Sequence, residues 1–339
     1  MKKLLILLII FVTACNNANE IGDYDGNRYR VFHPYKEGHS YSLNTLNNLN
    51  MEEVETYLMD ISKEYFNPKT NYYQNGQYLK ESDIKDILNE INSFEEIEVD
   101  GIKISPKYLT TIHEQNYLDS NGKLTGVSLG LVINRFQQYT NSYGATLYKE
   151  LEYEEVLKIA EELTSSVLQS YRSKYDLPKT RILVGLFFQT SVKDTRPGVY
   201  TKFGITTTNT IKFKDLNYSY HDLDSDYASV NDMTNYNAYS NLLENFKDLN
   251  MYVNAYAIYK DNNPVNIIIN FNSVNTNENL RLYINQRINN YLINSFKYQD
   301  DIKIYIRSNN EIKSVLIKNK NQIEGNIYLL DWKIIIYIV

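Results

Sequence analysis

The sequence predicts an α+β protein: two tandem strand–helix–hairpin repeats, each an antiparallel sheet with a packed helix, preceded by an N-terminal helical region. Two observations favour this class. Strand alternation and helical periodicity follow the same order twice, once on either side of a polar stretch at 217–231. A length of 339 residues also suffices for one large domain or two ordinary ones. We expect a signal peptide (1–14), a polar tether (15–24), an N-terminal helical and hairpin region (25–105), repeat 1 (106–216), a linker (217–231), repeat 2 (232–326) and an apolar tail (327–339).

The first fifteen residues have the three-part layout of a secretory signal. They read MKKLLILLIIFVTAC, with two lysines, an apolar run at 4–12 and short residues before a single cysteine. The run is too short for a membrane-spanning helix, which needs about 20 residues. Val-Thr-Ala-Cys fits the bacterial lipobox, although an ordinary secretory signal that happens to contain a cysteine is the alternative. The lipobox predicts diacylglycerol on Cys15, cleavage before it by the signal peptidase for lipoproteins, and anchoring at the outer face of the cell membrane.

Two helices and a hairpin are expected in the N-terminal region, and a third helix at the start of repeat 1. Apolar residues at three- and four-residue steps from Met51 predict a helix that ends before Pro68. Asn75-Gly76 between aromatic residues indicates a two-residue hairpin turn. A second helix has Ser82 as its expected cap. Ser105-Pro106 indicates the start of a third.

The two repeats account for most of the remaining chain. In the first, a strand at 127–133 precedes a helix at 152–173 and strands at 182–188 and 199–205. The second has a short helix at 239–248, strands at 252–259 and 265–271, a helix at 277–296, and strands at 302–306 and 312–317. The tail at 327–339 is either one more buried strand or an unstructured segment that adheres to the membrane or to itself.

Composition excludes several classes of function. Without Lys2 and Lys3 the chain has 33 basic and 41 acidic residues, a net charge of −8, which argues against nucleic-acid binding. Cys15 is the only cysteine, so the body has no disulfide, no cysteine-ligated metal site and no catalytic thiol. The 32 tyrosines could form a sugar-binding surface, but codons rich in A and T explain them without a ligand.

Candidate catalytic or metal-binding residues are weak. No histidine lies in a metal-binding motif, and His33 and His39 are expected at the surface. A stretch with a histidine and three aspartates faintly resembles a calcium loop, but it lacks the glycine and the terminal glutamate, which favours a solvated linker; its residues are His221, Asp222, Asp224 and Asp226. The glutamate pairs 154–155 and 161–162 are expected on a solvated helix face. We therefore predict no catalytic, metal or cofactor residues and no cofactor.

Several weak motifs, taken in order, resemble the CamS family of staphylococcal-type sex pheromone lipoprotein precursors. They span most of the chain: the lipobox, Tyr29-Arg30, His33 to Glu37, Ser62 to Glu64, Tyr72 to Leu79, Tyr108-Leu109, Glu114-Gln115, Gly126 to Ile133 and Arg196 to Tyr200. The resemblance implies two products, a lipoprotein body with a duplicated domain and a short apolar peptide trimmed from the leader. The peptide would comprise Leu8, Ile9, Ile10, Phe11, Val12, Thr13 and Ala14.

The resemblance implies a palmitate-bearing lipoprotein on the extracellular side of a Gram-positive cell membrane. Two features depart from the family pattern: the tether is shorter than is common, and the tail is an addition. The leader either serves as a signalling peptide or has no second function. We expect the body to be a non-catalytic binding or interaction module of unknown ligand. The alternatives are a lipid-anchored cell-envelope enzyme and a solute-binding lipoprotein.

Overall fold

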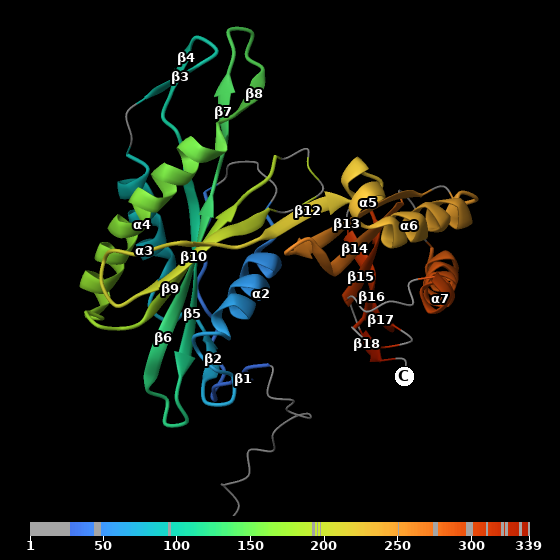
Figure 1. The fold of residues 1–339 in the computed structure, drawn as a ribbon, viewed down its shortest axis with the longest axis horizontal. Coiled ribbons are helices and arrows are strands. Elements are labelled where there is room, and N and C mark those ends of the chain that lie inside the picture. The colour runs from blue at the N-terminus through green and yellow to red at the C-terminus, as the bar shows by residue number, and fades with distance from the viewer. Residues whose placement is uncertain are drawn as a thin grey trace, which may run out of the picture.

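The chain forms two lobes, each built around a seven-stranded sheet (Figure 1). The computed structural model describes residues 28–43, 49–93, 96–191, 194, 196, 198–249, 251–273, 277–295, 301–309, 311–319, 322, 325–331 and 334–337. Cys15 and the leader segment 8–14 lie outside the described residues. We call residues 28–216 the first lobe and residues 217–337 the second lobe. The chain passes between them once.

The sheet of the first lobe is covered on both faces. Helices α3 (Glu81–Ile91) and α4 (Tyr153–Tyr175) pack on one face, and α2 (Met51–Ser62) packs on the other. Its central strands are therefore almost wholly buried. The strand order is β1 (Arg30–Val31), β2 (Tyr72–Asn75), β5 (Leu109–Leu118), β6 (Leu124–Ile133), β9 (Ile182–Phe188), β10 (Val199–Thr206) and β11 (Lys214–Asp215). Two hairpins project from one end (Figure 1): β3 (Ile97–Val99) with β4 (Ile102–Ile104), and β7 (Phe136–Thr140) with β8 (Thr146–Glu150).

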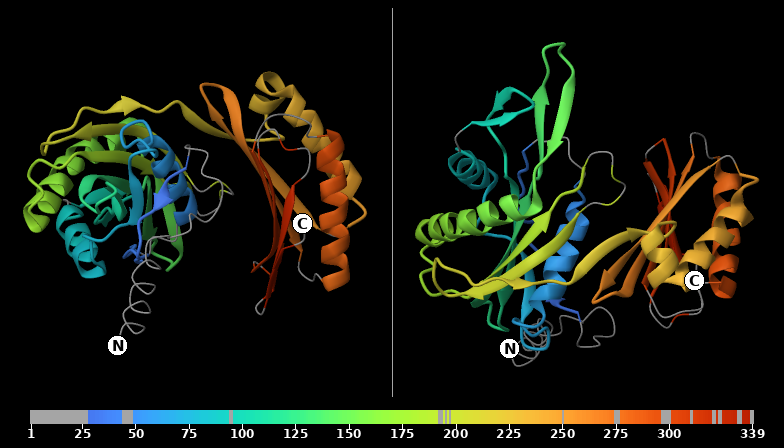
Figure 2. Two further views of the ribbon diagram at one scale, coloured as in Figure 1. Left: turned by 90° about the horizontal axis from the view of Figure 1, so that it is seen from below. Right: turned by 45° about the horizontal axis from the view of Figure 1, so that its top comes forward.

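The sheet of the second lobe carries its helices on one face only. Helices α5 (Asp226–Asn231), α6 (Met233–Phe246) and α7 (Glu278–Ser295) lie on the side away from the first lobe (Figure 2). The opposite face of this sheet is directed toward α2 of the first lobe. The strand order follows the sequence: β12 (Tyr218–Asp222), β13 (Tyr252–Lys260), β14 (Asn263–Ser273), β15 (Asp301–Ser308), β16 (Glu311–Lys318), β17 (Asn326–Asp331) and β18 (Ile334–Tyr337).

Both sheets are mixed, so the prediction of antiparallel sheets is wrong at their centres. Strands β6 and β9 pair in parallel across α4, and β14 and β15 pair in parallel across α7. A strand that returns after a long crossover helix runs parallel to the strand before it. The α+β class is confirmed. Each lobe has a hairpin, a helix and a second hairpin in this order, but descent of the two lobes from one duplicated unit stays a prediction.

Long segments with a periodic apolar pattern form the predicted helices and strands. The predictions based on short turn or cap motifs are wrong. Strand β2 pairs with β5 instead of turning into a hairpin, and the Gly76 N–H donates to the Glu114 carbonyl at 3.1 Å. No helix begins at Ser105-Pro106, because the chain there leads directly into β5. Ser82 is the second residue of α3, whose N-cap is Lys80.

Two segments outside the predicted repeats contain regular elements. The stretch 217–231, expected as a solvated linker, contains β12 and α5. The tail at 327–339 contributes most of β17 and all of β18, and β18 forms the edge of the sheet. Across the described ranges, no helix combines the length and the apolar character needed to cross a bilayer.

Candidate functional site

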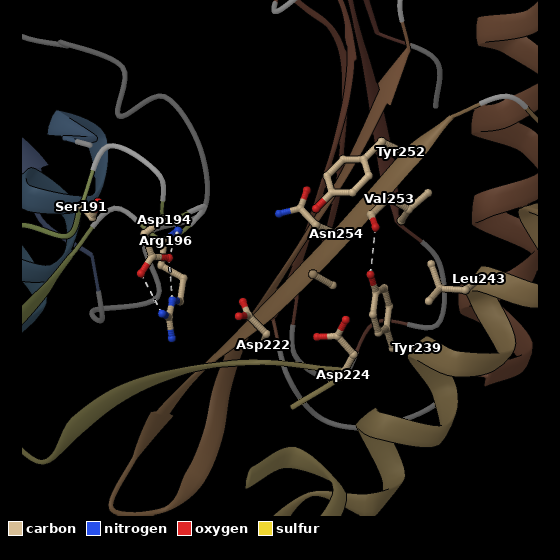
Figure 3. Close-up of a pocket in the computed structure, with 11 residues that line it drawn as sticks. Ser191, Asp194, Arg196, Asp222, Asp224, Tyr239, Leu243, Tyr252, Val253 and Asn254 are labelled. Atoms are coloured by element: carbon tan, nitrogen blue, oxygen red, sulfur yellow. Dashed lines mark hydrogen bonds and ion pairs between the residues drawn. The ribbon is translucent and has the colours of Figure 1, made fainter. Parts of the chain in front are cut away.

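A pocket of about 550 Å³ lies where the two lobes meet beside β12 and β13 (Figure 3). The first lobe contributes residues that follow β9, namely Ser191, Asp194 and Arg196. The second lobe contributes the end of β12, the start of β13 and one side of α6. This volume falls within the range of sites that hold small ligands.

Arg196 fixes the first-lobe wall of this pocket against the second lobe. Its guanidinium forms a fork with the Asp194 carboxylate, through Nε to Oδ1 at 2.8 Å and Nη2 to Oδ2 at 2.7 Å. Its Nη1 donates to the carbonyl of Tyr220 in β12 at 3.1 Å. The hydrogen bonds to Asp194 raise the pKa of Arg196, so the positive charge is permanent. Arg196 thus links the lobes without leaving its charge free for a ligand.

Asp222 and Asp224 point into the pocket from the end of β12 and the turn after it (Figure 3). The turn is held by the Leu223 N–H, which donates to the Ala255 carbonyl at 3.0 Å, and by the Ser225 hydroxyl, which donates to the Asp222 carbonyl at 2.5 Å. Burial raises the pKa of Asp222, and the nearby Arg196 opposes this shift.

The remaining wall is aromatic and aliphatic. Tyr239 on α6 is buried, and its hydroxyl donates to the Val253 carbonyl at 3.0 Å. Leu243 and Tyr252 lie at the rim with 36% and 65% of their surface exposed. The pocket therefore combines three carboxylates and one guanidinium with an apolar rim. This combination favours a ligand that joins a cationic group to an apolar or ring portion.

The residues suggested by the faint calcium loop divide between the two sides of β12. Asp222 and Asp224 line the pocket, whereas the His221 ring stacks on Tyr227 with 3.5 Å between ring centroids. Burial lowers the pKa of His221. Asp226 is the first residue of α5. His221 and Asp222 are neighbours on β12 and point to opposite faces of the sheet, so the four side chains do not converge. Within the part of the chain that the structure describes, no three His, Cys, Asp or Glu side chains are placed to hold a metal ion.

The other residues considered from sequence lie away from this pocket. Glu154, Glu155 and Glu162 are exposed on α4 and Glu161 is half-buried there, while His33 and His39 are at the surface. The sequence motifs did not point to Asp194, and Arg196 stood out only as the first residue of a family motif. Their proximity to Asp222 depends on how the lobes are placed, and the local sequence gives no sign of it.

Comparisons with known proteins agree with this architecture. The family model described as "CamS sex pheromone cAM373 precursor" matches residues 35–324. A sex pheromone precursor from Lactobacillus salivarius has a similar crystal structure, with a TM-score of 0.74 and 20% identity over 91% of this chain and 98% of that one. The C-terminal domain of the staph-cAM373 precursor from Staphylococcus aureus has a TM-score of 0.64 and 21% identity, over 84% and 98%.

No sequence among curated proteins matches the chain. These two proteins share the fold, and the family model covers most of the chain. The chain belongs to the CamS sex pheromone cAM373 precursor family.

Proposed function

We propose that the chain is a surface lipoprotein, held at the outer face of the membrane by diacylglycerol on Cys15, whose body is a non-catalytic binding module. The lipobox sequence and membership of the family support the anchor. The observation that carries the binding role is the pocket between the lobes, with Asp222 and Asp224 directed into it.

The anchor is tested with labelled palmitate in cells. Substitution Cys15→Ser removes the only thiol in the chain, so incorporation of the label should fall to background and the precursor should stay unprocessed. A labelled Cys15→Ser protein would rule out this anchor.

The leader is proposed as the source of a short apolar signalling peptide that ends at Ala14. Membership of the family and the predicted cut before Cys15 support this role. Mass spectrometry of culture fluid should find a peptide within Leu8 to Ala14. A sensitive search that finds none would remove this role and leave the binding module in place.

The pocket is tested by cross-linking the full lipoprotein on intact cells and identifying its partners. Asp222→Asn with Asp224→Asn removes two negative charges from the pocket, and the cross-linked ligand should be lost. A matched control, Glu154→Gln with Glu155→Gln, removes the same charge from an exposed face of α4 in the first lobe. Equal capture by both variants would contradict a role for the pocket.

A further inference from the structure

Helix α2 belongs to the core of the first lobe and also makes contact with the second. Val54 and Leu58 are fully buried against the first sheet. On another side of the helix, Tyr57 packs with Tyr256 and Ile268 on the open face of the second sheet. Figure 2 shows the two sheets as separate layers, and a single chain segment joins them. Contacts made by α2 are therefore a main determinant of how the lobes sit.

The carboxyl group of Glu53 is at the centre of this contact. The Tyr256 hydroxyl donates to Oε1 and the Tyr220 hydroxyl donates to Oε2, both at 3.2 Å. These tyrosines lie on the neighbouring strands β12 and β13. One side chain of the first lobe thus receives hydrogen bonds from two strands of the second. Beside it, Glu52 forms an ion pair with Lys303 of β15 at 3.7 Å.

The interface around Glu53 is loosely packed. A cavity of about 300 Å³ borders it on the side of Tyr57 and Lys303, and one of about 520 Å³ borders it on the side of Glu52 and Tyr305. Both spaces are open to solvent, and the contact cluster of Tyr256 and Ile268 is separate from the cores of the two lobes. The lobes can therefore separate at this surface without disrupting either core.

Ionisation of Glu53 opposes this contact. Burial raises its pKa to about 7, while the hydrogen bonds from Tyr256 and Tyr220 and the charge of Lys303 lower it, and Glu52 raises it. The docked lobes thus favour the protonated carboxyl: its contribution is fully present below pH 4.5 and is lost as the pH rises through about 7. The other titratable or charged groups that border the two cavities are Tyr57 and Asp60 of α2, Tyr218 of β12, and Asp301, Tyr305 and Arg307 of β15.

We propose that Glu53 is a pH-sensitive latch between the lobes. The neutral carboxyl holds α2 against β12 and β13, and the ionised carboxyl loosens the second lobe from the first. The hinge is the single chain segment between β11 and β12.

The latch is connected to the pocket described above through one residue. Tyr220 donates from its hydroxyl to Glu53 and accepts at its carbonyl from Arg196. Asp222 follows two residues later on the same strand. Loosening of β12 from α2 therefore changes the distance between Arg196 and Asp222 across the pocket. The link from the latch to ligand binding in the pocket rests on the proposed binding function, whereas the latch itself does not.

The latch is tested by fluorescence energy transfer between the lobes of the full chain. Cys15→Ser leaves no native thiol, and Lys85→Cys and Asn237→Cys place labels on exposed residues of α3 and α6. Transfer should fall between pH 5.5 and pH 8.5, with most of the change below pH 7, because the docking equilibrium weakens by about 30-fold over this interval.

Two variants separate the latch from general charge effects. Glu53→Gln keeps the shape and stays neutral, so transfer should remain high at both pH values. Glu52→Gln removes the neighbouring charge and its ion pair with Lys303 but should keep the transition. Equal transfer at both pH values in the parent chain, or a transition that survives in Glu53→Gln, would overturn the proposal. A normal transition with no ligand in the pocket would refute the binding function alone.

Discussion

Several residues of the first lobe are fixed by the space that their neighbours leave. Phe66 stacks on Tyr117 with 4.4 Å between ring centroids, and both rings are buried. Gly126 lies under this stack, and a Cβ atom there would be 2.0 Å from Cε1 of Phe66. Glycine at this position of β6 is thus required by packing.

Substitution Gly126→Ala should destabilise the protein by about 1–3 kcal/mol, because the ring cannot move without breaking its stack. Without the clash, alanine in a strand would instead stabilise by about 0.5–1 kcal/mol, so the sign of the change is informative. Urea unfolding measures the difference. Phe66→Leu in the same chain removes the clashing ring atoms, and the double variant should lose less than the sum of the single ones.

At the scale of elements, α3 and α4 are joined by one carboxylate. Asp83 of α3 accepts from Lys174 Nζ at 2.7 Å and from the Tyr175 hydroxyl at 2.5 Å. These contacts, led by Lys174, lower the pKa of Asp83 to about 2. A depressed pKa contributes stability that is present above pH 3.8 and is lost as the pH falls through about 2.

Asp83→Asn should therefore cost about 1–2 kcal/mol of unfolding free energy at pH 7, since Lys174 is partly screened by solvent, and about half as much at pH 3. Urea unfolding at both pH values measures it. Asp86→Asn, exposed on the same helix, serves as the control and should change stability little at either pH. If Asp83→Asn lowered the unfolding free energy equally at pH 7 and pH 3, the ionised Asp83 carboxylate would not be the stabilising group.

The elements also show which parts of the fold sequence can predict. Periodicity located α2, α4 and β9, because burial of one helix face or of a whole strand leaves a local pattern. Asn75-Gly76 suggested a hairpin, but β5 pairs with β2 from more than thirty residues away. The parallel pairings were missed for the same reason. Partners such as Val127 and Ile182 are far apart in the sequence, and only tertiary contacts bring them together.

At the scale of the molecule, the functional features arise between the lobes, where sequence is least informative. Asp222 and Asp224 stood out as polar residues, but Asp194 and Arg196 reach them only when the lobes come together. Glu53 appears in sequence as an ordinary polar residue of an amphipathic helix. Only the structure places it against Tyr220 and Tyr256 of the second lobe.

Two separate cores joined by a loosely packed contact predict that the lobes unfold independently when Glu53 is ionised. Ile304 is buried in the second core and Val167 in the first. In calorimetry at pH 8.5, Ile304→Ala should lower one transition, through a loss of about 2–5 kcal/mol, and Val167→Ala should lower only the other.

At pH 5.5 the docked lobes stabilise each other, so either substitution should shift both transitions or merge them. With Glu53→Gln, this coupled behaviour should persist at pH 8.5, because the neutral side chain keeps the contact between α2 and the second sheet. A single transition at both pH values in the parent chain would show that the lobes form one cooperative unit. The contact would then be a permanent part of the fold, and ionisation of one carboxyl would not be enough to open it.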